Sequence, residues 1–582
     1  MTEENLKGVA RIRQEFLVCS LKHIAVGTPN EDLVHDSELE EQGGTKKVKL
    51  ENGEAVKKRG QNKNRPQTAR QEKSQKLCPT LMNVAEDETP KHCVHGEKCQ
   101  FEHNIKKYLQ DKPSDLPGSC YVYRTYGRCP KGATCRFGSE HLTPEGRNIV
   151  NKDIWNPEWT AAKNFLSNDL MISLRKKKYD LRKSEDLVKE QQKKSKVGDI
   201  KSQDMEDGTE ANVGPVSDED LIRIRNEEKR KIDWKGKLYL APLTTVGNLP
   251  FRRICKKFGA DITCGEMAVA ENLLNGGKQE WALVRRHESE DIFGVQICGN
   301  NPYLLTKCAQ MLEENISMDF LDINCGCPID MFYEKGAGSG LMTREKPLTA
   351  AVECMSKVLS CPLTVKMRTG VQSDKNIAHK LIPKLKGYDV SLFTVHGRSR
   401  EQRYTKLADW DYIEECAKVA NPIPLFGNGD VLSYEDYNAG LSSGNVSGVM
   451  MARGALIKPW IFQEIKEQRH IDMPAQERLD ILKDYANYGL EHWGSDSQGV
   501  ETTRRFMLEW ISFLHRYIPF GVLEVTPQKI NDRPPPYKGR NELETLMASG
   551  NYEDWIKLSE MVLGPVPSGF AFLPKHKANA WK

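Results

Sequence analysis

Residues 320–368 decide the fold. The apolar run FLDINCGC (320–327) is followed by PLTAAVECMSKVLS (347–360), and then by the second apolar run LTVKMR (363–368). Runs with few polar residues are typical of strands that are buried on both faces. The intervening segment repeats its apolar residues at steps of three and four, which indicates an amphipathic helix. The stretch therefore predicts a strand, a helix and a second strand.

The same alternation continues in both directions, and eight apolar runs alternate with amphipathic segments. The runs are KLYLAPLT (237–244), ITCGEM (262–267), DIFGVQICG (291–299), FLDINCGC (320–327), LTVKMR (363–368), LFTVHGR (392–398), PLFGNGD (424–430) and GVMMARG (448–454). Eight such units match the size and count of a TIM barrel. We therefore predict an α/β fold with a (β/α)8 TIM barrel at 236–474. A doubly wound sheet is the alternative, but no Gly-x-Gly-x-x-Gly follows the first run.

Polar and reactive residues gather where the predicted strands end, which is where TIM barrels place their chemistry. They are Pro242, Leu243, Thr244, Gln296, Asn324, Cys327, Lys366, His396, Arg398, Asn428, Gly429, Asp430, Ala452, Arg453 and Gly454. The turns after the last two runs are where these barrels often bind phosphate through backbone N–H groups. Lys366 and His396 suit a delocalised anion such as a flavin ring. The sequence therefore predicts a phosphorylated cofactor at this rim.

The early cysteines have the spacing of metal ligands. Cys120, Cys129, Cys135 and His141 form C-x8-C-x5-C-x5-H, and Cys78, Cys93, Cys99 and His103 form C-x14-C-x5-C-x3-H. Three thiolates and one imidazole suit tetrahedral zinc, and a segment this short has too little core to fold without a metal. The set resembles a tandem pair of CCCH zinc fingers with unusual spacing. His92 and His95 are rival ligands in the first finger, and Ser139 stands where the usual histidine of the second would fall.

The two fingers also carry groups that suit single-stranded RNA, namely aromatic rings for stacking and cations for phosphates. These are Phe101, Tyr121, Tyr123, Tyr126 and Phe137, with Lys98, Arg124, Arg128, Lys131 and Arg136. We expect RNA contact, and the alternative is that the fingers brace the protein.

The remaining segments are assigned from composition. We expect residues 1–76 to be a disordered, charged region, in which Lys57–Arg65 (KKRGQNKNR) is a candidate RNA contact or nuclear localisation signal. The fingers take 77–145, a charged helical or flexible linker takes 146–235, helices take 475–560, and a tail takes 561–582. The net charge is only +4, so a polyanion must meet local patches. No signal peptide or membrane span is visible, and we expect a soluble protein of the cytoplasm, the nucleus or both.

Several motifs together resemble the flavin-dependent tRNA-dihydrouridine synthases. They are APLTTVGNLPFRRIC (241–255), DINCGCP (322–328), VKMRTG (365–370), VHGRSREQRYTKLADW (395–410), GNGD (427–430) and MMARGAL (450–456). The preceding finger pair is similar to the eukaryotic branch that acts on uridine 47 of tRNA. The resemblance implies an oxidoreductase that saturates the C5–C6 bond of uracil, with FMN as cofactor and NADPH or NADH as reductant. It also implies tRNA as partner, with mRNA as a second candidate, and no obligate protein partner.

The resemblance also implies roles for single residues. Cys327 would be the acid that protonates C5, with Cys325 as its rival, and Asn324 would contact the uracil. Pro242, Leu243, Thr244, Gln296, Lys366 and His396 would contact the flavin, and Asn428, Gly429, Asp430, Ala452 and Arg453 its ribityl phosphate. Arg398, Arg400 and Arg403 would meet tRNA phosphates, unless they are only solvated.

In the helical domain, Arg504, Arg505, His515 and Arg516 would form a basic face toward tRNA. The neighbouring Phe506, Met507, Trp510, Phe513, Leu514 and Tyr517 are expected to be core. Two rival functions remain, a flavin reductase of a free small molecule and a non-enzymatic RNA-binding protein.

Overall fold

The computed structural model describes residues 8–18, 66, 72–158, 160–201, 229–402, 404 and 406–575. The basic run Lys57–Arg65 and Arg403 lie outside these residues. Within the described part of the chain, no helix is long and apolar enough to cross a bilayer.

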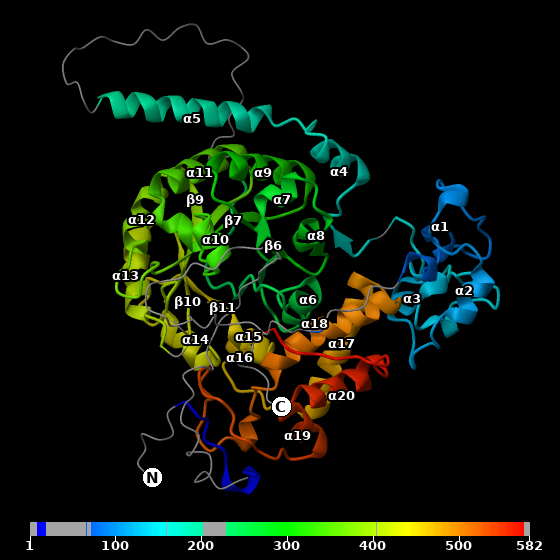
Figure 1. Cartoon of the computed structure of the whole chain (residues 1–582). Helices are drawn as coiled ribbons and strands as arrows, with labels where there is room; N and C mark the ends of the chain where they lie inside the picture. Colours follow the sequence, from blue (N-terminus) through cyan, green and yellow to red (C-terminus); the bar gives the residue numbers. More distant parts are fainter. Residues whose placement is uncertain are drawn as a thin grey trace, which may run out of the picture.

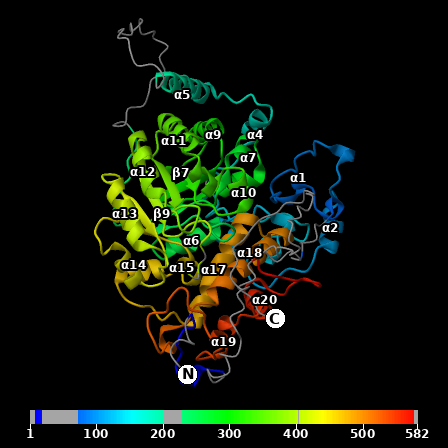
Figure 2. The ribbon, with the colours of Figure 1, turned by 60° about the vertical axis from the view of Figure 1, so that its left-hand side comes forward.

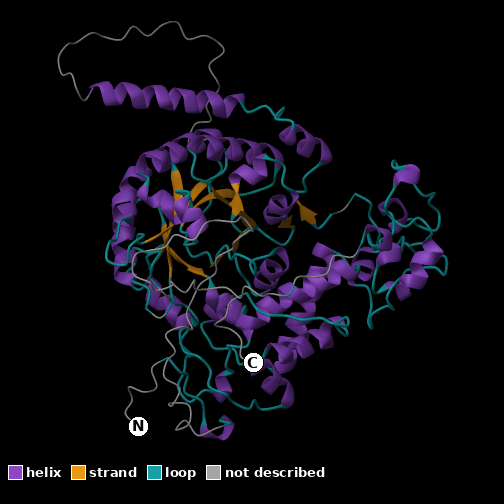
Figure 3. Ribbon diagram, viewed as in Figure 1, coloured by secondary structure: helices purple, strands orange, loops and turns teal. Residues whose placement is uncertain are grey.

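A closed parallel barrel forms the centre of the molecule (Figures 1 and 3). Its strands are β2 (Tyr239–Leu240), β3 (Ile262–Cys264), β6 (Ile292–Cys298), β7 (Phe320–Cys325), β8 (Leu363–Arg368), β9 (Val390–His396), β10 (Leu425–Asn428) and β11 (Gly448–Met451). Each strand pairs in parallel with the next, and β3 pairs with both β2 and β6, which closes the sheet. The TIM-barrel prediction is confirmed in all eight runs. A short extra strand, β4 (Ala268–Val269), pairs with β6.

Helices surround the barrel, and the longer ones bury an apolar stripe, as α9 and α11 do (Figure 3). They are α6 (Leu249–Lys257), α7 (Ala270–Leu274), α8 (Lys278–Trp281), α9 (Pro302–Asn315), α10 (Asp330–Glu334), α11 (Glu345–Val358), α12 (Ala378–Leu385), α13 (Trp410–Ala420), α14 (Tyr434–Leu441), α15 (Arg453–Ile457) and α16 (Ile461–Glu467). Side-chain caps begin several of them. Asn248 caps α6, and Ser433 caps α14 in a reciprocal capping box with Asp436.

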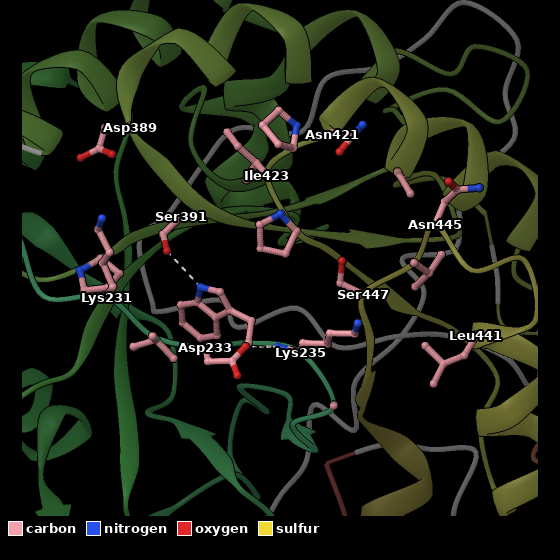
Figure 4. Close-up of a pocket in the computed structure, with 18 of the residues that line it drawn as sticks. Lys231, Asp233, Lys235, Asp389, Ser391, Asn421, Ile423, Leu441, Asn445 and Ser447 are labelled. Carbon is pink, nitrogen blue, oxygen red and sulfur yellow. Dashed lines mark hydrogen bonds between the residues drawn. The ribbon is translucent and has the colours of Figure 1, made fainter. Parts of the chain in front are cut away.

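The amino-terminal end of the barrel is closed by Trp234. Its indole packs edge-on against Phe320, with ring centroids 5.4 Å apart, and Nε1 donates to Ser391 Oγ at 2.9 Å. An open cavity of about 820 Å³ lies beside it, lined by residues that precede strands, such as Asp389, Pro424 and Ser447 (Figure 4). This cavity is therefore at the opposite end of the barrel from the predicted chemistry.

The carboxyl-terminal helices pack against one side of the barrel (Figures 1 and 2). They are α17 (Ala475–Trp493), α18 (Ser497–Leu514), α19 (Glu542–Ala548) and α20 (Tyr552–Leu563). The aromatic and apolar residues of α18 form core as predicted, and Trp510 stacks edge-on against Phe251 of α6.

The predicted basic face of α18 is wrong for two of its residues. Arg504 is fully buried and donates to Ser559 Oγ and to the carbonyl of Gly564. His515 is buried against Trp555. Both side chains turn inward because α20 covers this side of α18.

The segment 146–235 is more than a linker. It contains β1 (Ala162–Lys163), which pairs with β5 (Arg286–His287), and helices α4 (Asn168–Arg175) and α5 (Arg182–Lys201). Helix α5 packs along α9 and α11 (Figure 1). Ser184, Leu187 and Val188 are buried there, and the high charge of the sequence around them concealed this narrow apolar stripe.

Two predictions about the chain ends also need correction. Residues 8–18, predicted as disordered, form bridges from Ile12 to Leu523 and from Leu17 to Tyr537, and Ile12 is buried. The predicted tail from 561 continues α20 and then buries Phe572 and Lys575. In both segments a few apolar side chains fill hollows that the local sequence cannot reveal.

Candidate active site

The predicted site residues meet at the carboxyl ends of adjacent strands. The register places Arg368 of β8 beside His396 of β9, and His396 beside Asn428 of β10. On the other side, Asn324 of β7 pairs with Lys366 of β8. The barrel therefore brings residues more than a hundred positions apart into one row.

The loop that carries Cys327 is held from two sides. Asn324 Oδ1 accepts hydrogen bonds from the backbone N–H groups of Gly326 at 3.0 Å and Cys327 at 2.8 Å. Gly338 packs on the other side with φ of 56°, and a Cβ there would lie 2.9 Å from Cys327 Cβ. Only glycine suits this position, because it tolerates both the left-handed backbone and the close approach.

The structure separates Cys327 from its rival. Cys325 is fully buried in the packing between strands and helices, and burial raises the pKa of its thiol well above the ordinary value. Cys327, two residues later, is partly exposed at the strand ends. A thiol that must reach a substrate needs this exposure, so the geometry favours Cys327.

A chain of hydrogen bonds runs beneath the loop and starts at Asp322. Thr364 Oγ1 donates to one carboxylate oxygen at 2.6 Å, and Gln296 Nε2 donates to the other at 2.7 Å. Asn324 Nδ2 then donates to Gln296 Oε1 at 2.8 Å. The orientation of both amides is thereby set. The sequence reasoning missed Asp322, although a carboxylate inside a strand that is buried on both faces is itself a signal.

Four cations surround His396 and make the site strongly positive. They are Lys366, Arg368, Arg398 and Arg453. Burial, together with these charges, depresses the pKa of His396 well below its usual range, so the imidazole is neutral at pH 7. Burial and Arg368 lower the pKa of Lys366 to about 8, while burial raises the pKa of Asp322 to about 6. Such an excess of buried cations fits an anionic ligand.

Asp430 joins two of these cations. Its carboxylate lies 2.6 Å from Arg398 Nη2 and 2.7 Å from Arg453 Nη2. The ring of Tyr404 lies 3.9 Å from the Arg453 guanidinium carbon and 5.2 Å from that of Arg398. Tyr404 was not singled out from the sequence, because its position after β9 carries no pattern of its own.

Arg398 does not lie where the sequence placed it. Only 1% of it is exposed, and besides Asp430 it donates to the carbonyl of Lys406 at 2.6 Å. Arg398 therefore connects the loops of the rim from inside the protein. The prediction that it contacts tRNA phosphates at the surface is wrong. Arg400 pairs with Asp330 and lies 3.9 Å from the ring of Tyr333, so it ties this loop to the Cys327 loop.

The turns after β10 and β11 owe their glycines to packing. A Cβ on Gly429 would lie 2.7 Å from the Trp410 indole, and one on Gly454 would lie 2.2 Å from the carbonyl oxygen of Val431. Helix α15 begins directly after β11, and its first residue is preceded by Ala452, which offers no side-chain cap.

Comparison with known proteins identifies the family of the chain. Residues 239–514 match the family model described as "Dihydrouridine synthase (Dus)". A protein of Xenopus tropicalis named "tRNA-dihydrouridine(47) synthase [NAD(P)(+)]-like" is 50% identical over 629 residues, which cover 100% of this chain and 98% of the relative. The chain belongs to the dihydrouridine synthase family.

Further members of the family show the same extent. A Homo sapiens relative with the same name is 52% identical, with 90% of this chain and 84% of the relative covered. In Yarrowia lipolytica, "tRNA-dihydrouridine(47) synthase [NAD(P)(+)]" is 42% identical, with 100% and 95% covered. The family model spans the barrel, α17 and α18, whereas the Xenopus tropicalis and Yarrowia lipolytica relatives cover all of this chain and therefore include the cysteine clusters.

The two cysteine clusters have the geometry of metal sites. Within each predicted set of four ligands, the ligand atoms lie within 4.8 Å of one another. The first set is Cys78, Cys93, Cys99 and His103, and the second is Cys120, Cys129, Cys135 and His141. Sulfur atoms of Cys78 and Cys93 are 3.8 Å apart, as are those of Cys120 and Cys135. Tetrahedral zinc with Zn–S bonds of about 2.3 Å separates its sulfur ligands by about 3.8 Å. The donor sets therefore fit zinc.

The histidine of the second cluster is oriented for a metal. His141 Nδ1 lies 3.0 Å from Asn148 Oδ1, whereas its Nε2 is buried without a hydrogen-bond partner in the described structure. A metal-binding histidine usually has a hydrogen-bond partner on one ring nitrogen and the metal on the other. His141 joins the cluster rather than Ser139, and His103 joins the first cluster rather than His92 or His95.

The second finger is embedded in the helical domain. Its residues Cys120, Cys129 and Cys135 are fully buried in the core shared with α17 and α18. Arg136 N donates to the carbonyl of Ser495 at 2.8 Å, and Lys131 pairs with Asp496 at 2.9 Å. The aromatic rings of this finger that were expected to stack on RNA bases are also in contact with the rest of the protein.

Helix α3 (Tyr121–Tyr126) supplies two of those rings. Tyr121 lies edge-on to Tyr488 of α17, and Tyr126 donates to Glu491 at 3.0 Å. Bracing, the alternative weighed from the sequence, therefore describes the second finger. The first finger, with α1 (Pro79–Met82) and α2 (Ile105–Asp111), keeps Lys98 and His103 exposed.

Proposed function

We propose that the protein reduces a uridine of tRNA to 5,6-dihydrouridine, with FMN as cofactor and NADPH or NADH as reductant. The observation that carries the proposal is a partly exposed thiol, Cys327, fixed at the same strand ends as a buried cluster of cations. Position 47 is proposed from the printed names of the relatives.

The residues at the rim suit FMN. Arg453 and the first turn of α15 would hold its phosphate, with Asn428, Gly429, Asp430 and Ala452 forming the surrounding turns. Lys366 and the neutral His396 would contact the ring system and its ribityl chain. Pro242, Leu243, Thr244 and Gln296 would complete the pocket on the side of β2 and β6.

The chemistry divides between the cofactor and the chain. FMN, once bound and reduced by NADPH or NADH, would supply hydride to C6 of the uracil. Cys327 donates its proton to C5 from the other face, and water then restores the thiol. A thiol with an ordinary pKa near ~8.5 is mostly protonated at pH 7 and can serve as a general acid. Asn324 holds the Cys327 loop through its amide oxygen, and a contact of Asn324 with the uracil remains part of the proposal.

RNA binding is proposed for the first finger and for the rim of the barrel. The first finger exposes cations beside Phe101, which suits single-stranded RNA. Its four ligands, like those of the second finger, would hold zinc. The nucleotide must leave the RNA stack to reach Cys327, as other enzymes that act on bases require.

The test is to incubate the full-length protein with NADPH and unmodified tRNA and to map each uridine that gains two hydrogen atoms. We expect conversion at position 47 by the wild type and a loss of at least about 100-fold in Cys327→Ala, as for removal of a general acid. Cys325→Ala is the matched control and should retain conversion.

Three outcomes would overturn the proposal in different ways. NADPH oxidation without any changed uridine in tRNA or mRNA would favour a reductase of a small molecule. RNA binding without bound flavin would favour a non-enzymatic RNA-binding protein. Loss of activity in Cys325→Ala but not in Cys327→Ala would reverse the assignment of the acid.

A further inference from the structure

The carboxyl-terminal segment returns to the barrel after α20. Residues 564–575 run back along α18, and Phe572 is buried in the core of the helical domain (Figure 1). The backbone N–H of Lys575 donates to Glu509 Oε2 of α18 at 3.1 Å, and only 5% of Lys575 is exposed. The segment is therefore packed against the helical domain as far as Lys575.

Lys575 makes a long-range contact with the mouth of the barrel. Its Nζ donates to Thr245 Oγ1 at 3.1 Å, across 330 positions of the sequence. Thr245 lies in the loop after β2 and directly follows Pro242–Thr244, the residues assigned above to the flavin. A side chain of the carboxyl-terminal segment thus reaches the loop that follows the first strand of the barrel.

Thr245 adopts a backbone conformation that costs free energy. Its φ is 74°, in the left-handed region that β-branched residues rarely adopt. Such a conformation persists only where surrounding groups hold it, and it is frequent beside ligands. At Thr245, each polar group is held.

Three contacts hold Thr245. Its N–H donates to Glu266 Oε2 at 2.6 Å, and its carbonyl accepts from Asn248 Nδ2 at 3.1 Å. Lys575 supplies the third contact, on the hydroxyl. Burial raises the pKa of Glu266 above its ordinary value, and the hydrogen bond from the Thr245 N–H and the positive charges of Arg252 and Lys575 oppose that rise.

We propose that Lys575 is a positioning residue for the cofactor, which fixes the strained turn at Thr245 and so shapes the adjoining wall at Pro242–Thr244. The helical domain thereby contributes to the barrel site through its carboxyl-terminal segment. This inference rests on the proposed function, since it assigns the turn to FMN binding.

The test compares full-length Lys575→Met, Lys575→Arg and Lys557→Met. Methionine keeps the aliphatic stem and removes the charge, whereas arginine keeps both charge and donors. Lys557 is an exposed lysine of α20 that pairs with Asp554, which makes it a matched control. Two quantities are measured, the FMN dissociation constant and the hydrogen exchange of residues 241–249 in the protein without added flavin.

We expect Lys575→Met to raise the FMN dissociation constant about 10-fold, as for loss of one charged hydrogen bond. Exchange at 241–249 should accelerate by a similar factor, while α17 and α18 keep their protection. Lys575→Arg should restore both quantities to within about 3-fold, and Lys557→Met should match the wild type.

Unchanged flavin affinity and unchanged exchange at 241–249 in Lys575→Met would overturn the inference. Equal loss of protection over α17, α18 and the turn, in Lys575→Met and Lys575→Arg alike, would also overturn it, because Lys575 would then only anchor the segment. If the wild type binds no FMN, the proposed function fails, but the exchange measurement still decides whether Lys575 holds the turn.

Discussion

Arg368 Nε donates to the carbonyl oxygen of Gly326 at 2.7 Å, directly before Cys327. The same guanidinium donates from Nη1 to the carbonyl of Ser399 at 3.0 Å, and only 7% of Arg368 is exposed. One side chain of β8 therefore ties the loop of the proposed acid to the loop after β9. Its planar fork makes the two contacts at once, which a lysine cannot do.

We predict that Arg368→Lys lowers the rate of dihydrouridine formation by about 10- to 100-fold, because loss of a charged hydrogen bond of ~1.5–3 kcal/mol loosens the Cys327 loop. Flavin should remain bound, since a cation is retained. Single-turnover conversion of tRNA measures the rate. Arg469→Lys, at an exposed site, is the control, and equal rates in the two variants would contradict the positioning role.

The two zinc clusters should differ in what they stabilise. We predict that Cys129→Ser lowers the melting temperature of the whole protein and releases one zinc ion, because this cluster lies in the core of the helical domain. Cys99→Ser should release one zinc ion with little change in melting temperature, because Cys93 and Cys99 are only partly buried and His103 is exposed. Metal analysis and thermal unfolding of both variants measure this.

Affinity for tRNA gives the complementary result for the fingers. Cys99→Ser should weaken tRNA binding, with conversion of saturating tRNA retained. A fall in melting temperature of the same size in both variants would show that the first finger is also structural.

Trp234 is predicted to stabilise the barrel from its amino-terminal end. Trp234→Ala should lower the free energy of unfolding by about 3–5 kcal/mol, the usual cost of emptying a buried tryptophan site. Denaturant titration measures it. Trp234→Phe keeps most of the packing against Phe320 and should lose less. Equal losses in both variants would show that the hydrogen bond to Ser391 dominates instead.

We predict that two buried histidines lower the stability of the folded protein in acid. Burial, with the charge of Arg253, lowers the pKa of His287 to about 4, and burial, with Arg516, lowers that of His515 to about 4. Below the unfolded pKa of about 6.5, only the unfolded chain binds these protons, so stability present above pH 6.5 is lost as the pH falls toward 4.

Each of these histidines contributes a slope of up to about 1.4 kcal/mol per pH unit in that window. His515→Gln should therefore flatten the dependence of unfolding free energy on pH between about 6.5 and 4. Near pH 8, the effect of His515→Gln on the free energy of unfolding should not change with pH. An unchanged slope in His515→Gln would show that His515 titrates normally in the folded protein.

The barrel could be predicted because each strand is buried on both faces, so the sequence of each strand is apolar whichever strands it pairs with. The positions of Cys327, Asn324 and Lys366 could also be predicted, because the carboxyl ends of the barrel strands lie on one rim. Arg398 could not, because its position depends on how the loop after β9 folds back onto Asp430. Asp322 was missed, because its hydrogen-bond partners, Gln296 and Thr364, lie on the two adjacent strands, β6 and β8.

The sequence by itself determined the strand and helix order, the rim on which chemistry occurs, and the two metal-ligand sets, since each depends on local spacing. Only the tertiary structure decided which finger is embedded, that α18 turns Arg504 inward, and that Lys575 reaches Thr245. These depend on contacts between segments far apart in the sequence, by 55 positions for Arg504 and Ser559 and by 330 for Lys575 and Thr245, where a few buried polar atoms must find partners. No local pattern encodes which partners they find.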